Sequence, residues 1–182
     1  MSKHKMVFNY KLLQTGDMVC CAGRSPFAGI TRIVTSGWRN LFRRDIAVHT
    51  GMIVEMYGQK LIAEMQARGL ELNSLERYAK VGGRRWVISI KRNNKVTKPD
   101  SQAALQSQIA LDLRRGIEYD YAGLFEFVSK RIKDNKKRCY CSEYYYQLTR
   151  WLVNYPKEFK EKVSPVELQI CSDFVVVTNA FR

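Results

Sequence analysis

The sequence predicts one domain that mixes strands with helices, and three observations support this prediction. The chain has 182 residues, which suits one domain able to bury about two thirds of the surface of its unfolded form. Apolar runs of strand length are interspersed with segments of helical periodicity. No internal repeat or low-complexity linker divides the sequence. We therefore expect residues 1–182 to form a single domain, with residues 1–11 as a basic N-terminal extension.

Strands are predicted where short β-branched and apolar runs lie between turn residues. Such runs cover, in chain order, residues 18–22, 46–56, 61–66, 70–72, 85–90 and 174–177. The first of them follows a turn at Gly16 and Asp17, and it is apolar throughout. A continuous apolar run of this length indicates a strand that is buried on both faces.

A hairpin is the clearest of these predictions, since two of the runs flank a turn centred on residues 58–59. Side chains alternate between the two faces of a strand, so His49 shares a face with Ile53. The predicted turn places Ile53 opposite Glu64, with Gln66 two residues further along the same face. A register slip of one residue would move both polar side chains to the other face.

Helices are predicted from amphipathic spacing and from residues that begin or end a helix. The best defined follows Pro99, with Asp100 as the N-cap, Leu105 and Ile109 turned inward and Gly116 as the terminator. Further helical segments are expected, in chain order, at residues 27–42 (a short helix with a basic loop), 74–78, 121–132 and 141–151, and from Ser164 onward.

The net charge of +14 is large for a chain of this length. It could reflect a nucleic acid, an anionic membrane or cell-wall polymer, or a bias toward solubility. No apolar run approaches the ~18 residues needed to span a bilayer, and the N-terminus lacks the apolar core of a signal peptide. The five cysteines are odd in number and unevenly spaced, which favours reduced thiols. We therefore expect a cytoplasmic protein.

The residues that could carry chemistry centre on Cys141, which opens a predicted helix. A helix N-terminus favours a thiolate and an oxyanion, because its first N–H groups have no partner within the helix. A cysteine nucleophile also needs an imidazole base, and of the two histidines only His49 lies in a predicted strand. Glu64 could orient the imidazole and compensate its charge, whereas Gln66 could only orient it.

The order of several short motifs resembles the permuted NlpC-type, papain-like cysteine hydrolases, a group that includes a bacterial amidase-like branch and is distantly related to lecithin:retinol acyltransferase-like proteins. The resemblance covers roughly residues 12–174 and rests on their joint order more than on any one motif. The motifs are Leu13-Gln14-Thr15-Gly16-Asp17, His49-Thr50-Gly51-Met52-Ile53-Val54, Glu64, Tyr119-Asp120-Tyr121, Tyr140-Cys141-Ser142-Glu143 and Ser164-Pro165-Val166-Glu167-Leu168.

This resemblance implies an α+β fold of the circularly permuted papain-like type, in which an antiparallel, barrel-like sheet packs against helices. It also implies that Cys141 is the nucleophile, that His49 is the general base and then the acid, and that Glu64 is the third member of the triad. Permutation would explain why the histidine precedes the cysteine. The motif does not decide between Glu64 and Gln66.

Four further residues are candidates for substrate binding. Tyr140, just before the nucleophile, is the aromatic residue that we expect in the cleft. Asp17 could help to shape the site, although an aspartate in a turn before a strand is more often a local cap. Tyr119 and Asp120 could line the cleft, and Asp120 could instead cap the helix that follows. The cysteine spacing lacks the paired Cys-x-x-Cys knuckles of a zinc site, so we expect no metal and no cofactor.

The leading hypothesis from the sequence is a cysteine hydrolase that cleaves an amide or peptide bond through an acyl-enzyme. A second is an acyltransferase or lipid-ester hydrolase at an anionic membrane, which the shared permuted order and the basic charge motivate. A third is a non-enzymatic polyanion or nucleic-acid binder on a degenerate hydrolase scaffold. The expected partners are therefore a peptide, amide or acyl substrate and an anionic polymer or membrane surface, with nucleic acid less favoured.

Overall fold

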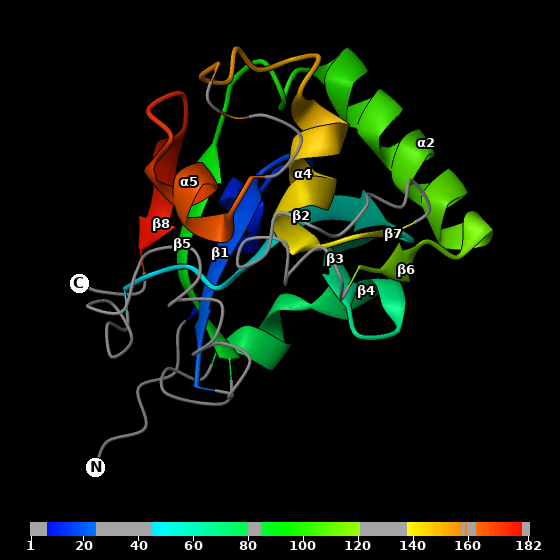
Figure 1. Ribbon diagram of the computed structural model, residues 1–182, viewed down its shortest axis with the longest axis horizontal. Helices are drawn as coiled ribbons and strands as arrows, with labels where there is room; N and C mark the ends of the chain where they lie inside the picture. Colours follow the sequence, from blue (N-terminus) through cyan, green and yellow to red (C-terminus); the bar gives the residue numbers. More distant parts are fainter. Residues whose placement is uncertain are drawn as a thin grey trace, which may run out of the picture.

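The computed structural model describes residues 7–24, 45–79, 85–120, 138–157, 159 and 163–179 (Figure 1). Within these ranges, six strands form one antiparallel sheet in the order β4-β3-β2-β1-β5-β8. The strands are β1 Met18–Gly23, β2 His49–Met56, β3 Gln59–Gln66, β4 Gly69–Ser74, β5 Arg85–Arg92 and β8 Val175–Asn179. All six correspond to predicted strands. The helices predicted at 27–42 and 121–132 lie outside the described residues.

The helices are distributed around this sheet. They are α2 Pro99–Arg115, α4 Cys141–Thr149 and α5 Pro165–Ile170, with the short 3-10 helices η1 Tyr10–Leu12 and η3 Leu75–Tyr78. Two short strands, β6 Glu118–Tyr119 and β7 Arg138–Cys139, pair in parallel and lead the chain into α4. Helix α4 packs against β2 and β3 (Figure 1). The fold is therefore of the α+β class, with an antiparallel sheet covered by helices.

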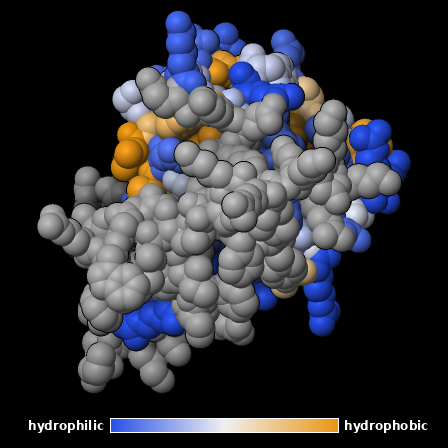
Figure 2. Space-filling view, in the orientation of Figure 1, coloured by the Kyte–Doolittle hydropathy of each residue, from blue (hydrophilic) through white to orange (hydrophobic). Residues whose placement is uncertain are grey.

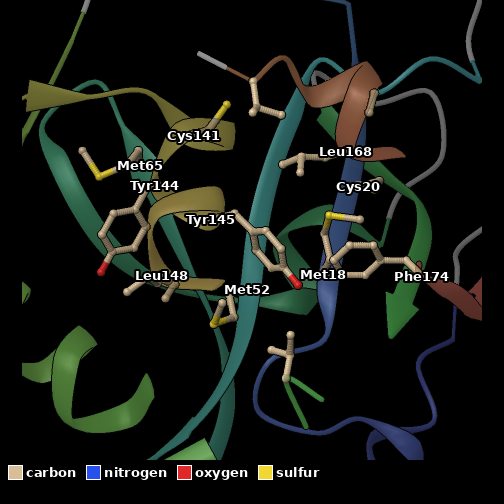
Figure 3. Packing of buried hydrophobic residues seen from close by; sticks show 14 of the residues in the cluster. Met18, Cys20, Met52, Met65, Cys141, Tyr144, Tyr145, Leu148, Leu168 and Phe174 are labelled. Atoms are coloured by element: carbon tan, nitrogen blue, oxygen red, sulfur yellow. The ribbon is translucent and has the colours of Figure 1, made fainter. Parts of the chain in front are cut away.

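The sheet separates two hydrophobic clusters. The first lies under α4, where Tyr145 and Leu148 meet Met52 from β2 (Figure 3). The second lies on the other face and includes Ile53 and Ile62. Because apolar side chains are buried on both faces, every residue of β1 is buried and its sequence shows a continuous apolar run instead of alternation.

The hairpin of β2 and β3 forms as predicted, but its register differs by two residues. The turn falls on Tyr57 and Gly58, which both have positive φ (55° and 70°), as a type I′ turn requires. Ile53 therefore pairs with Ile62, and the predicted pairing of Ile53 with Glu64 is wrong. A shift of two residues preserves the face of every side chain, so Glu64 remains on the side of His49.

The ends of helix α2 correct one predicted cap. Lys98 is the N-cap, Pro99 is the first helical residue, and Asp100 lies inside the first turn. Proline favours this position because its fixed φ suits the first turn of a helix. The N–H group that proline lacks would have no partner within the helix at this position. Gly116 ends the helix as predicted, with a left-handed φ of 65°.

Several N-terminal residues contact the sheet. Phe8 is buried in the second hydrophobic cluster. The Lys60 ammonium donates to the carbonyl oxygens of Tyr10 and Leu13, at 2.8 and 2.6 Å. Phe8, Tyr10 and Leu13, which lie in or next to the predicted N-terminal extension, therefore contact the rest of the fold.

The surface carries few large apolar side chains in the described ranges. Figure 2 shows a mostly hydrophilic described surface, with a small hydrophobic area on the side where α5 and β8 lie. Ile170, Val175 and Val176 are exposed there. Among the described helices, none has both the length and the apolar character needed to cross a bilayer.

Candidate functional site

Cys141 is the first residue of α4, and Tyr140, the N-cap, separates it from the end of β7. The Glu143 carboxylate, in the first turn, accepts a hydrogen bond from the Tyr140 N–H at 3.3 Å and so helps to fix the start of the helix. Tyr145 then anchors the helix, because its ring is buried and its hydroxyl donates to the Gly16 carbonyl at 3.0 Å. These contacts of Glu143 and Tyr145 fix the position of the Cys141 thiol (Figure 3) and of the N–H groups at the start of the helix.

His49 and Glu64 meet across the hairpin. The distance from His49 Nε2 to Glu64 Oε2 is 2.5 Å, and the two residues are only 3% and 1% exposed. Gly51 lies between them on the same face, and a Cβ there would meet Ile62 Cγ2 at 2.5 Å and Glu64 Cβ at 3.2 Å. The absence of a side chain at Gly51 therefore lets the imidazole and the carboxylate approach each other diagonally.

Cys141, the first residue of α4, is the third member beside His49 and Glu64, and its thiol lies near the start of β2. Its thiol interacts with the His49 imidazole and with the backbone N–H of Thr50, and both interactions lower the pKa of the thiol. Glu64 occupies Nε2 of the imidazole, so Nδ1 is the ring nitrogen that is left for Cys141. Three residues that are far apart in the sequence thus form a continuous Cys-His-Glu arrangement.

The electrostatics of the pair favour a thiolate beside an imidazolium. Burial raises the pKa of Cys141, but the His49 charge, the hydrogen bonds from His49 and Thr50, and Arg85 outweigh it and bring the pKa below its usual value. Burial and Arg85 lower the pKa of His49, yet the Cys141 thiolate and the hydrogen bonds to Cys141 and Glu64 raise it overall. Both shifts widen the pH range in which the ion pair exists.

Glu64 is held by more than the imidazole. Its Oε1 accepts hydrogen bonds from the Tyr78 hydroxyl at 2.5 Å and from Asn73 Nδ2 at 2.9 Å. Burial raises the pKa of Glu64, but the hydrogen bond and charge of His49, the Tyr78 hydroxyl and Arg85 lower it overall. Glu64 is therefore an ionised carboxylate in contact with His49.

Gln66, the alternative third residue, has different partners. Its amide Nε2 donates to the Tyr78 hydroxyl at 3.0 Å, and its Oε1 accepts from Arg85 Nη1 at 3.2 Å. It thus reaches the imidazole only through Tyr78 and Glu64. No sequence pattern indicated Tyr78, Asn73 or Arg85, because these residues come from different elements and match no motif.

Asp17 lies away from this group. It directly precedes β1 at Met18, whereas His49 pairs with Cys21 near the other end of that strand. The Asp17 carboxylate is fully buried, accepts the Gln14 N–H at 2.8 Å and forms an ion pair with Arg92 at 2.7 Å. These contacts are those of a local cap and a structural ion pair, and they do not fit a substrate-binding role.

The other predicted binding residues lie near the nucleophile but are largely covered. Tyr140 is 1% exposed, so its side chain offers no surface to a ligand in this conformation. Tyr119 pairs with Cys139 in the two-stranded sheet that precedes Cys141, and it is partly buried. Asp120 is buried, and the helix that it was predicted to cap lies outside the described residues.

The remaining buried cysteines differ chemically from Cys141. Burial raises the pKa of Cys20 to about 11, and burial also raises the pKa of Cys21 and of Cys171. Cys141 is thus the one thiol of the four described here whose surroundings favour the thiolate. In the described ranges, no group of three or more His, Cys, Asp or Glu side chains could hold a metal ion.

The comparisons with known proteins bear on the fold. No family model matches the chain, and no curated protein matches it. Among solved structures, it resembles the metalloprotein yiiX (DUF1105) from Escherichia coli O157:H7, with a TM-score of 0.63 and 17% sequence identity. The match covers 93% of this chain and 98% of that chain. At this identity the similarity is one of fold, and it extends over nearly the whole length of both proteins.

Proposed function

We propose that this protein is a cysteine hydrolase of the permuted papain-like type, which cleaves an amide or peptide bond through a Cys141-His49-Glu64 triad. One observation carries the proposal: the buried 2.5 Å contact between His49 and Glu64, with the same imidazole lowering the pKa of the Cys141 thiol at a helix N-terminus. A nucleophile, a base and a group that orients the base are the set that covalent acyl transfer requires.

The first half-reaction forms an acyl-enzyme. The Cys141 thiolate attacks the carbonyl carbon of the scissile bond, and the carbonyl oxygen becomes an oxyanion. The backbone N–H groups that begin α4 lie beside the thiol and can donate to this oxyanion. When the intermediate collapses, the carbon–nitrogen bond breaks and the amine leaves with the proton that the His49 imidazolium gives up.

The second half-reaction releases the acyl group. Neutral His49 takes a proton from a water molecule, and the resulting hydroxide attacks the thioester carbonyl. Collapse of this second intermediate breaks the carbon–sulfur bond, yields the carboxylic acid and restores the ion pair of Cys141 and His49. During both steps Glu64 holds the imidazole in one orientation and stabilises its positive charge.

The proposal is tested first by the reactivity of Cys141. At pH 6 iodoacetamide should alkylate Cys141 at least about ten times faster than any other cysteine, because its pKa is lowered while those of Cys20, Cys21 and Cys171 are raised. Intact mass followed by peptide mapping gives the rate for each thiol. Equal rates at all the cysteines would contradict an activated thiolate.

Turnover gives the second test, on a panel of peptide amides and activated esters. Cys141→Ala should abolish both turnover and the acyl-enzyme mass shift of the intact protein, with little change in the thermal unfolding midpoint. Cys171→Ala is the matched control, since it also removes a buried thiol but should retain both signals. Turnover that survives Cys141→Ala would contradict the assignment of Cys141 as the nucleophile. The mass of a trapped acyl group would identify the acyl donor.

A further inference from the structure

A chain of hydrogen bonds extends from Glu64 of the triad to Arg85. Arg85 Nη1 donates to Gln66 Oε1 at 3.2 Å, and Gln66 Nε2 donates to the Tyr78 hydroxyl at 3.0 Å. The Tyr78 hydroxyl in turn donates to Glu64 Oε1 at 2.5 Å. Each donor points toward Glu64, so a guanidinium stands at one end of the chain and a carboxylate at the other. Hydrogen bonds aligned in this way strengthen one another.

The roles of the atoms in this chain are fixed by their chemistry. An arginine can only donate, so the Gln66 oxygen must face Arg85 and its NH₂ group must face Tyr78. The Tyr78 oxygen then accepts from Gln66, and its single proton is directed to Glu64. The Tyr78 hydroxyl therefore has one available orientation, and it always presents a donor to Oε1 of the carboxylate.

We propose that Tyr78 is a positioning residue of the triad, whose hydroxyl holds Glu64 ionised and aligned with His49, and that Gln66 and Arg85 orient that hydroxyl. This inference rests on the proposed function, since it assigns residues to the same site. Tyr78 touches neither Cys141 nor a substrate in this role and acts only through Glu64. Asn73 supplies the second donor to Oε1, at 2.9 Å.

We expect the Tyr78 hydroxyl to influence the pH at which Glu64 becomes protonated. The groups around Glu64 that titrate or carry charge are His49 from β2, Cys21 from β1, Glu71 from β4, Tyr78 from η3, Arg85 from β5 and Cys141 from α4. Of these, Tyr78 contributes a neutral donor that stabilises only the ionised form of Glu64. Its removal should therefore raise the pH at which Glu64 becomes protonated.

A merely structural role would give a different result. The Tyr78 ring lies in the second hydrophobic cluster, and Tyr78→Phe keeps this ring while it removes the hydroxyl. If the hydroxyl only stabilised the fold, the variant would unfold at lower temperature but would keep the pH profile of the wild type. The pH profile of Cys141 reactivity therefore separates the two roles without requiring a known substrate.

The experiment measures the rate of Cys141 alkylation by iodoacetamide from pH 3.5 to 8. In Tyr78→Phe we expect the acid limb of this rate profile to move up by about one pH unit. A donor to an ionised carboxylate lowers the pKa of that carboxylate by roughly this much, and the variant loses this donor. Gln66→Met should shift the limb in the same direction by less. In a Glu64→Gln background, Tyr78→Phe should cause no further shift, because the ionisable carboxylate is gone.

Tyr144→Phe is the matched control, because the buried Tyr144 hydroxyl also donates to a buried carboxylate, that of Asp112, at 3.0 Å. It should leave the acid limb in place. An unchanged limb in Tyr78→Phe, or an equal shift in Tyr144→Phe, would overturn the assignment of Tyr78 while wild-type Cys141 still reacted as a thiolate. If wild-type Cys141 titrates as an ordinary thiol, the proposed function fails and this inference fails with it.

Discussion

Two buried carboxylates, one in the sheet and one directly before it, have contrasting partners. Asp17 lies next to β1 and is bound by Arg92 through two contacts of 2.7 Å and by a backbone N–H at 2.8 Å. Glu64 lies in β3 and is bound by His49 and Tyr78 at 2.5 Å and by Asn73 at 2.9 Å. Both are 1% exposed or less, so neither is distinguished by burial.

The difference lies in what the partner can do. A guanidinium keeps its charge at every pH relevant to a protein, so the ion pair of Asp17 and Arg92 is constant and serves the fold. An imidazole can gain and lose a proton near neutral pH, so under the proposed function Glu64 faces a charge that changes during the reaction. We therefore expect Glu64 to affect activity under the proposed function, and Asp17 to affect stability. Substitutions at the two sites should separate activity from stability.

The largest expected effect is the loss of activity in Glu64→Gln. Tyr78 and Asn73 both donate to the same side of Glu64, so the oxygen of the new amide should take that position and its NH₂ group should face His49. That nitrogen of His49 would then have to accept, which forces the proton onto the nitrogen facing Cys141. We expect the kcat/KM to fall about 10,000-fold, as for a wrong tautomer in other triads. The thermal unfolding midpoint should change little, and near-normal activity would contradict the assignment.

Asp17→Asn should show the opposite pattern. It leaves Arg92 without its charged partner, and since the Arg92 side chain is 19% exposed, water compensates only in part. We expect the free energy of unfolding in urea to fall by about 2–3 kcal/mol. Activity per folded molecule should stay within about twofold of the wild type. Asp100→Asn, which alters an exposed carboxylate in α2, serves as the control and should be nearly neutral.

The smallest expected effect on activity among the site variants concerns the spacing of the hairpin. Gly51→Ala places a Cβ at 2.5 Å from Ile62 Cγ2, so β3 must move away from β2 and Glu64 must move with it. We expect a loss of about 1–3 kcal/mol in the free energy of unfolding and a clear fall in kcat/KM. Gly58→Ala is the control in the same hairpin, because its Cβ meets nothing within 4 Å and only its positive φ causes strain. It should lower stability without a change in kcat/KM, and equal activity in both variants would contradict the role of Gly51.

Much of the sheet could be predicted from the sequence because its strands are short apolar runs separated by turn residues. The hairpin register was misplaced because Tyr57, an unusual residue at positive φ, takes the first turn position that the sequence suggested for Gly58. The face of Glu64 was nevertheless predicted correctly, since an error of two residues leaves the alternation intact. The cap of α2 was misplaced because Asp100 and Pro99 both signal a helix start and are adjacent.

The sequence by itself determined the strands, the start of α4 at Cys141 and the side of the hairpin that bears His49 and Glu64. Each of these depends on local patterns, namely periodicity, turn residues and the end of a helix. Only the tertiary structure decided that Glu64 and not Gln66 contacts the imidazole, that Asp17 is bound by Arg92, and that Tyr78 donates to Glu64. These contacts join residues from separate elements, and their distances depend on how the strands are paired and how α4 packs on them.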